Sequence, residues 1–461
     1  MNEKTKFAPG WPGIPAKWTS SAKSGVGTAL NKSSRVWFTI SHGILNEIYY
    51  PRLDQACTRD AGFIVTDSKD FFSEEKRNTE CKVEYLAKGV PGYKLTNSCE
   101  LKRYSIIKEI IADPFRDCVL QKVTFNNQLK DEDPLNLFLI ISPHLGNHGA
   151  GNTGWSGDYK GTPMMFAERD GIAMAVACSI PWKNCSIGFA GSSDGWQDLR
   201  QNKKLTSNYN KAENGNIALT GEVDISQNEK NEFVIAIGFG QNWAEAGQRA
   251  KASILDDFNE SKKIYINEWK EWYKNLDLVN VKGNNKNLEL ISASVLRIHE
   301  AKRFPGGLIA SLSIPWGFNK GDDDLGGYHL VWPRDLAEAA GGLLALNAFD
   351  DAKRVINFLI STQEKDGHWS LPKEWMHLDA RKLKDLFAKY PNVRLCISGH
   401  LHLVDRAEYN GVTYICDGAV CGAWWGGNHY ECDEGYGVFD LYDDGTFAHQ
   451  YISYGWVPVP E

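Results

Sequence analysis

The sequence predicts a multidomain chain with an all-β region first, an all-α region that is only begun, and a short α/β region last. Three observations support this. Short β-branched or aromatic runs, separated by Gly, Asn, Asp or Pro, occupy residues 10–240. Amphipathic helical patterns replace them from about residue 242. Beyond residue 376 a strand pattern is followed by two hairpin signals.

The first region is expected to be a large antiparallel β-sandwich, because its strand-like runs are short and evenly interrupted by turn residues. No internal repeat is visible in it. The ten expected strands are residues 35–41, 44–51, 61–67, 81–87, 104–113, 118–125, 136–143, 171–180, 217–225 and 232–240.

The second region is predicted to be helical. Over residues 242–276, apolar residues recur at intervals of four, three and four, which places them on one stripe of a helix; they are Tyr265, Trp269, Trp272 and Leu276. After a polar break, a second helix is marked by Leu288, Ile291, Val295 and Ile298. Two more helices are expected at residues 335–348 and 351–363, with Asp350 or Asp351 as the N-cap of the last.

The third region is predicted to start with a helix that carries Ala380, Leu383 and Phe387, followed by a strand at residues 393–399. Asn410-Gly411 and Asp444-Gly445 are typical of the tight turns of β-hairpins. This ending differs from the helices before it.

Bulk properties limit the class of protein. The chain has 461 residues, 42% hydrophobic and 24% charged, which is ordinary for a globular protein of two or three domains. It has no apolar run of the length that spans a membrane, and its N-terminus lacks a secretory signal, so we expect a cytoplasmic protein without a membrane partner. A net charge of −7 without a basic stripe argues against a nucleic-acid partner. Ten scattered cysteines without a CxxC pair favour buried thiols.

The stretch "GGYHLVWPRDL", residues 326–336, is the best candidate for a sugar site. Arg334 and Asp335 stand side by side at a helix start, where the guanidinium can donate to vicinal hydroxyls and the carboxylate can accept from them. Tyr328 and Trp332 can supply the aromatic wall of a pocket. The alternative interpretation is a surface Arg–Asp pair that caps a helix. The nearby acidic stretch at residues 321–327 can in principle bind a hard cation, but it shows no ligand spacing and is interpreted as a solvated loop.

Long runs of the chain resemble a known family. They include "APGWPGIPAKWTSSAKSGVGTAL", "SRVWFTISHGILNEIYYPRLDQACTRDAGFIVTD", "GGYHLVWPRDLAEAAGGLL" and "QEKDGHW". Residues from about 8 to 371 resemble the N-terminal part of bacterial glucoamylases and glucodextranases, glycoside hydrolase family 15. The resemblance implies a β-supersandwich at residues 8–275 and the start of an (α/α)6 barrel at residues 276–371. It also implies an α-glucan or oligosaccharide partner, no cofactor for this part, and a subsite for the non-reducing-end glucose. That subsite would be lined by Tyr328, Trp332, Arg334 and Asp335.

The chemistry implied by the resemblance is inverting hydrolysis that releases glucose from non-reducing ends. It requires two carboxyl groups roughly 6.5–9.5 Å apart. In the family both are glutamates that follow the matched segment, and this chain changes its pattern before either. Glu338 and Glu364 match neither position, so no catalytic residue is assigned. Because each acid or base contributes on the order of 10²–10⁴ in rate, we expect a truncated and catalytically impaired enzyme. The alternative is a non-catalytic carbohydrate-binding protein.

A second candidate site lies in "SGHLHLVDR", where His400 and His402 are spaced so that both imidazoles can reach one metal. Residues from about 376 to 461, including "NVRLCISGHLHLVDRAEYNGVTYICDGAVCGAWWGG" and "YGVFDLYDDGTF", resemble the C-terminal part of a calcineurin-like metallophosphoesterase. The resemblance implies an α/β fragment over residues 372–461. It also implies that His400 and His402 are the last two ligands of a two-metal site, here a vestigial divalent-metal site. A metal-dependent phosphoesterase is therefore a further alternative.

The other ligands of such a site have only formal counterparts. Asp366 with His368, and Asn147 with His148, lie inside the glycosidase-like runs and in reversed order, so we interpret them as coincidences.

The two resemblances meet at a seam, residues 370–375. A gene fusion after a deletion and an assembly or gene-model error would both produce it. Because three or four barrel helices alone would leave apolar faces open, we expect the region after about residue 285 to fold poorly and the sandwich to be stable.

Overall fold

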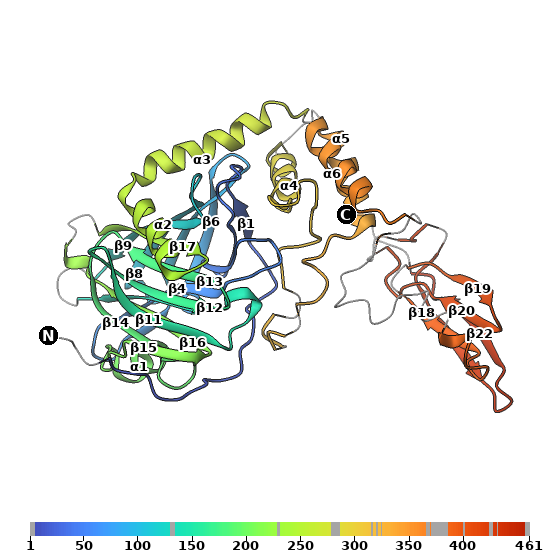
Figure 1. The fold of residues 1–461 in the computed structure, drawn as a ribbon, viewed down its shortest axis with the longest axis horizontal. Helices are drawn as coiled ribbons and strands as arrows, with labels where there is room; N and C mark the ends of the chain where they lie inside the picture. The colour runs from blue at the N-terminus through green and yellow to red at the C-terminus, as the bar shows by residue number, and fades with distance from the viewer. Residues whose placement is uncertain are drawn as a thin grey trace. The chain divides into compact units, whose positions relative to one another are not determined.

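The structure is a computed structural model that describes residues 5–129, 134–227, 231–277, 286–314, 317–319, 321–323, 325–365, 369, 386–399, 402–423, 427–430 and 432–456. The chain divides into two compact units, residues 1–363 and residues 364–461 (Figure 1). None of the described helices is long and apolar enough to span a bilayer.

The first unit contains a sheet of eight strands in which β10 lies between β4 and β16, all antiparallel. Its path is β1-β2-β3-β4-β10-β16-β14, and β5 pairs with β4. The strands are β1 (Gly25–Thr28), β2 (Trp37–Ser41), β3 (Ile44–Tyr49), β4 (Thr58–Thr66), β5 (Phe72–Glu74), β10 (Asn136–Pro143), β14 (Trp182–Phe189) and β16 (Ile217–Val223).

The second sheet has nine strands in the order β15-β11-β12-β13-β17-β9-β8-β7-β6, again antiparallel. They are β6 (Thr79–Ala87), β7 (Val90–Cys99), β8 (Tyr104–Ala112), β9 (Cys118–Asn127), β11 (Asn152–Tyr159), β12 (Thr162–Arg169), β13 (Ile172–Cys178), β15 (Lys211–Gly215) and β17 (Glu232–Gly240). Each of the ten runs predicted as strands overlaps one strand of the two sheets.

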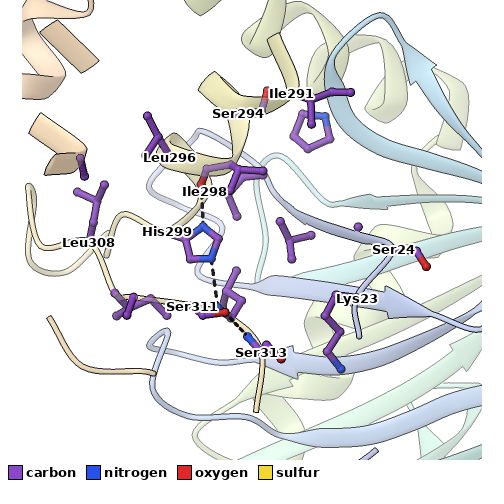
Figure 2. Close-up of a pocket in the computed structure, with 18 of the residues that line it drawn as sticks. Lys23, Ser24, Ile291, Ser294, Leu296, Ile298, His299, Leu308, Ser311 and Ser313 are labelled. Atoms are coloured by element: carbon purple, nitrogen blue, oxygen red, sulfur yellow. Dashed lines mark hydrogen bonds between the residues drawn. The ribbon is translucent and has the colours of Figure 1, made fainter. Parts of the chain in front are cut away.

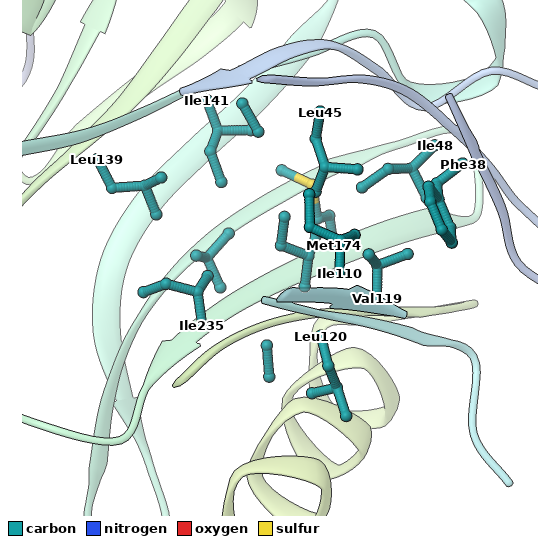
Figure 3. Packing of buried hydrophobic residues seen from close by; sticks show 14 of the residues in the cluster. Phe38, Leu45, Ile48, Ile110, Val119, Leu120, Leu139, Ile141, Met174 and Ile235 are labelled. Atoms are coloured by element: carbon teal, nitrogen blue, oxygen red, sulfur yellow. The ribbon is translucent and has the colours of Figure 1, made fainter. Parts of the chain in front are cut away.

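The two sheets enclose one apolar core, to which Leu45, Ile141 and Met174 contribute (Figure 3). Period-two alternation explains how one strand serves both faces of its sheet. On β9, Val119 points into the core, and the next residue, Leu120, points to the side where helix α2 (Trp243–Leu255) packs (Figure 3). The predicted sandwich is therefore confirmed.

The helices of the first unit, apart from α2, are α1 (Gly195–Asn202), α3 (Phe258–Tyr273), α4 (Lys286–Ile298), α5 (Pro333–Ala345) and α6 (Phe349–Thr362). The helical region predicted over residues 242–276 is divided by a break between α2 and α3, and the apolar stripe lies on α3 except for Leu276, which follows its end. Within α3, Tyr265 donates to the Pro91 carbonyl at 2.8 Å and Trp269 donates to the Thr28 carbonyl at 3.1 Å. Both rings are fully buried, so α3 is fastened to the sandwich.

The predicted N-cap of α6 is wrong. The helix is capped at Ala348 without a side-chain hydrogen bond, and Asp350 and Asp351 lie inside its first turn. Asp351 instead accepts from the Trp272 indole at 3.0 Å and pairs with Arg297 at 3.1 Å. The Asp351 carboxylate, which the sequence pattern offered as a local cap, therefore binds side chains of α3 and α4 instead.

Helices α5 and α6 pack on each other through a second, smaller apolar cluster that includes Leu336, Leu343 and Val355. The main core of the sandwich also includes Ile298, the last residue of α4, and two residues between α4 and α5, Ile309 and Leu312. The start of an (α/α)6 barrel at residues 276–371 stays a prediction.

The second unit contains a small sheet of β18 (Leu395–Ser398), β20 (Val412–Cys416) and β19 (Asp405–Tyr409), and a separate hairpin of β21 (Gly435–Leu441) and β22 (Phe447–Ser453). Asn410 and Gly411 both have positive φ, 50° and 77°, as a two-residue hairpin turn requires. Both predicted hairpins are confirmed. Most of the helix predicted around Leu383 lies outside the described residues, and the metallophosphoesterase-like identity of the unit stays a prediction.

Candidate functional site

The four residues predicted to bind sugar lie where a Gly-rich loop enters α5. Trp332 occupies the N-cap position, and Pro333 follows as the first helical residue, where its missing N–H is not needed. The Trp332 indole donates to the Gly327 carbonyl at 2.9 Å, which folds the loop back on the helix start. Local geometry thus holds the indole ring in place beside Arg334.

Arg334 and Asp335 form an open pair. Their nearest nitrogen and oxygen atoms are 3.8 Å apart, longer than a hydrogen bond, and their side chains are 59% and 48% exposed. Such an exposed pair contributes little to stability. Both groups therefore remain accessible to ligand hydroxyls, as a sugar subsite requires. Tyr328 is likewise exposed.

A cavity of about 660 Å³ lies next to this loop, between α4, residues 308–313 and the sandwich (Figure 2). Its wall is mostly apolar on the α4 side and carries Lys23, Ser311 and Ser313 on the opposite side (Figure 2). Asp335 and Glu338 of α5 also line it, whereas Tyr328, Trp332 and Arg334 do not. The structure therefore brings one of the four predicted residues to the cavity and leaves three on the adjacent loop and helix start.

His299 stands at the centre of the cavity wall (Figure 2). Its Nδ1 donates to the Val295 carbonyl at 2.7 Å, so its Nε2 is left to accept from the Leu312 amide at 3.1 Å. Burial lowers the pKa of His299. Both ring nitrogens of this neutral imidazole are used by the protein, so His299 positions the loop at residues 308–313 and does not act as an acid or a base.

His329, next to Tyr328, contacts Tyr49, which also binds the backbone of the loop at residues 308–313. The Tyr49 hydroxyl donates its hydrogen to the Leu312 carbonyl at 2.6 Å. Its oxygen therefore accepts from His329 Nε2, which lies 3.2 Å away. Burial lowers the pKa of His329 to about 4. The neutral ring thus ties the sugar-site loop to strand β3 of the sandwich.

Lys23 supplies a buried cation at the cavity. Its ammonium lies 2.6 Å from Glu47, whose side chain is fully buried, and it donates to the Ser20 carbonyl at 2.8 Å. Glu47 also accepts from the Thr39 hydroxyl at 2.5 Å. The charge of Lys23 is therefore neutralised within the sandwich and holds the cavity wall in place.

Sequence reasoning missed most of this cavity. Lys23, His299 and Ser313 are far apart in the sequence and carry no shared motif. The one available signal was the Gly- and Pro-rich stretch before the sugar-site loop, which marks a structured loop without indicating its neighbours. Glu338 was singled out as a nearby carboxylate, and the structure places it on the cavity wall.

Of the two predicted metal ligands only His402 is described, because His400 lies outside the described residues. His402 has a positive φ of 58°, and its Nδ1 lies 2.6 Å from the Gly422 carbonyl. Its ring is 5.8 Å from that of His429. In the described ranges no group of three or more His, Cys, Asp or Glu side chains is arranged to hold a metal. The divalent-metal site stays a prediction.

The formal ligand pairs have structural roles where they are described. Asn147 accepts from the Ala56 amide and donates to the Asp54 carbonyl, both at 2.7 Å, so its side chain fixes a turn. Asp366 and His368 lie outside the described residues. In the acidic stretch, Asp322 accepts from the Gly149 amide at 2.5 Å, which ties that loop to the sandwich.

Comparison with known proteins identifies the first unit. Residues 8–274 match the family model described as glucodextranase, domain N. The chain belongs to the glucodextranase domain N family. The N-terminal supersandwich expected from the sequence is thereby placed in its family.

Two relatives extend the likeness beyond that domain. A glucoamylase of Clostridium sp. (strain G0005) is 38% identical over 356 residues, which are 77% of this chain and 50% of the relative. A crystal structure of a bacterial glucoamylase complexed with acarbose superposes with a TM-score of 0.75 at 36% identity, covering 80% of this chain and 55% of that chain. The chain thus spans about half the length of each relative.

Proposed function

We propose that the chain is a glucoamylase-type glycoside hydrolase whose loop and helix start at residues 326–336 bind the non-reducing-end glucose of an α-glucan. The observation that carries this proposal is the 38% identity to a glucoamylase across 77% of the chain. The likeness to a glucoamylase structure that holds acarbose supports a saccharide ligand.

The geometry of the subsite suits recognition of a single sugar ring. Arg334 offers several N–H donors in a fixed fork, and Asp335 offers acceptor oxygens. Because the two groups are 3.8 Å apart and open to solvent, a pair of neighbouring hydroxyls can be held by both at once. Trp332 at the helix start and Tyr328 on the loop supply aromatic surface beside them.

Catalysis is proposed to be impaired. Inverting hydrolysis needs one carboxyl group to protonate the leaving oxygen and another to activate water. Asp335 is assigned to binding, and Glu338 and Glu364 match no catalytic position of the resembled family. Without an assigned acid or base, binding of the sugar is proposed to persist while glucose release is slow.

The test measures binding and turnover separately. Acarbose and maltotriose binding is followed by calorimetry with the wild-type chain and with Arg334→Ala and Asp335→Asn. We expect each substitution to weaken binding about tenfold, because a charged partner of buried sugar hydroxyls is removed. Arg406→Ala is the matched control, since Arg406 is an exposed arginine of the second unit paired with Glu408.

Glucose release from maltooligosaccharides and dextran is measured on the same samples. A rate close to background supports the proposed impairment. Turnover typical of an intact enzyme would show that acid and base are present and would refute the impairment. Unchanged binding in both variants would instead refute the subsite.

A further inference from the structure

A second groove, of about 560 Å³, lies on the sandwich itself. It is formed by β11, β12 and β15 at one end of the nine-stranded sheet and by the start of α2. None of the residues that line it lines the cavity beside α5. It therefore requires an explanation of its own.

Strand register places its main side chains on one face of the sheet. Trp155 of β11 is directly paired with Phe166 of β12 and with Lys211 of β15. Thr153, two residues before Trp155 and so on the same face, is paired with Glu168. Aromatic and carboxylate groups therefore point to the same side of the sheet.

The aromatic rings form a corner. Trp155 stacks on Phe166 with ring centroids 5.4 Å apart and an interplanar angle of 19°. Trp243, the first residue of α2, stands edge-on to Phe166 at 5.9 Å and 85°. Phe166 is buried beneath, whereas Trp243 is 42% exposed. Gly157, on the same strand face as Trp155, has no side chain that would fill the space beside the Trp155 indole.

Polar groups surround this corner and remain available. Glu168 and Asp158 are exposed, and among the described residues the Asp158 carboxylate accepts only from the Gly161 amide of its own turn, at 2.8 Å. Across the described part of the chain, the indole N–H groups of Trp155 and Trp243 and the Glu168 carboxylate have no protein hydrogen-bond partner. Trp155 is half-buried and Trp243 is 42% exposed, so a ligand in the groove can reach both indoles and the exposed carboxylates beside them.

We propose that this groove is a second saccharide-binding site, which holds an α-glucan chain apart from the subsite at Arg334. Flat sugar faces stack on the two indoles, as apolar surface with polar edges favours. Hydroxyl groups donate to Glu168 and Asp158 and accept from the indole N–H groups. The choice of an α-glucan as ligand rests on the proposed function; the groove itself is defined by its own residues.

The experiment is affinity electrophoresis of the full chain in gels that contain soluble starch, dextran or hydroxyethylcellulose. It is run in the Arg334→Ala background, so that the remaining retardation reports the groove alone. We expect retardation by starch, by dextran or by both, and none by the β-linked polymer. The starch and dextran arms show whether α-1,4 or α-1,6 chains are bound.

Substitutions then locate the binding. Trp243→Ala should raise the dissociation constant about tenfold, as removal of a central aromatic ring does in binding surfaces. Glu168→Gln, at an exposed position that folding does not depend on, should also weaken binding. Phe115→Ala is the matched control, because Phe115 is an equally exposed ring near Arg116, which pairs with Asp256 at the opposite end of α2.

The outcomes are separable. Loss of retardation in the groove variants, with Phe115→Ala unchanged, supports the proposal. No retardation in the Arg334→Ala background, or equal retardation in all groove variants, overturns the groove and leaves the proposed function standing. Retention of groove binding, together with acarbose binding that neither Arg334→Ala nor Asp335→Asn weakens, would overturn the proposed subsite alone.

Discussion

Replacing Glu300 with Gln should loosen the helices α4 and α6 without unfolding the sandwich. The Glu300 carboxylate follows α4 and is bound by Arg354 of α6 at 2.9 and 3.0 Å, by Arg297 of α4, and by the Gly306 amide at 2.8 Å. Burial alone would raise the pKa of Glu300, but the Arg354 hydrogen bonds and the charges of Arg297 and Arg354 outweigh it, and the pKa is lowered. Gln keeps one oxygen for the Gly306 amide, removes the charge, and replaces the oxygen that accepts from Arg297 and Arg354 with an NH2 group that cannot accept.

The expected loss follows from the burial of the network. Breaking a fully buried ion pair by removing one partner costs roughly 3–5 kcal/mol. The Glu300 side chain is 7% exposed, but those of Arg354 and Arg297 are 32% and 22% exposed, so water can solvate the released cations. We therefore expect a loss of about 2 kcal/mol in the local free energy of opening, below the buried-pair range and above that of surface pairs.

Hydrogen exchange followed by mass spectrometry measures this loss segment by segment. A loss of about 2 kcal/mol corresponds to roughly 30-fold faster exchange in α4 and α6, with the central strands of both sheets unchanged. The control is Glu271→Gln, which removes an exposed pair with Lys274 on α3 and should change little. Exchange in α6 that rises less than about twofold, or rises equally in the sandwich, would refute the reasoning.

Three further predictions concern stability. The free energy of unfolding should fall as the pH falls from about 6.5 to about 4, because neutral, buried His329 takes up a proton only on unfolding; denaturant titrations at both ends of this range test it, and His329→Gln should reduce the slope. Lys108→Met should cost about 3 kcal/mol or more, because the fully buried Lys108 ammonium lies 2.7 Å from the fully buried Glu75 carboxylate; adding Glu75→Gln should restore much of the midpoint in the same titration, and no recovery would contradict the role of the unpaired charge. Gly411→Ala should cost about 1 kcal/mol through backbone strain alone, since φ is 77° and no atom lies within 4 Å of the added methyl; amide exchange in β19 and β20 should accelerate, and unchanged exchange would show that the turn is not strained.

The sequence allowed the sandwich to be predicted because its ten most regular strands alternate or run apolar over several residues. The strands that the sequence did not indicate lack this apolar pattern. β11, "NTGWSGDY", contains two glycines and polar residues typical of loops, and it is a strand because β12 and β15 pair with it on either side. β7 includes a Pro and a Gly near its start and is likewise held between β6 and β8.

The candidate site could be predicted only where it is local. The sequence predicts a helix start after a Gly-rich loop near Arg334 and Asp335, and α5 begins there, at Pro333. The cavity depends on residues that the fold brings together, such as Lys23 and His299. No periodicity in the sequence indicates that these two residues line one cavity. Asp351 shows the same limit, because its ion pair with α4 and its hydrogen bond from α3 cannot be predicted from the first turn of α6. The expectation that the region after about residue 285 folds poorly stays a prediction.

The shared core of the sandwich and the first helices has a consequence for how this chain can be recombined. Ile298, Ile309 and Leu312 are part of the same buried cluster as the strands, and Tyr49 of β3 holds the Leu312 backbone. A crossover at residue 275, where the family model stops matching, would divide that cluster between two pieces. Each piece would then expose apolar surface that is buried in this chain. A crossover near residue 363 would keep the cluster whole. Chimeric libraries built on this scaffold should therefore treat residues 1–363 as the smallest exchangeable block.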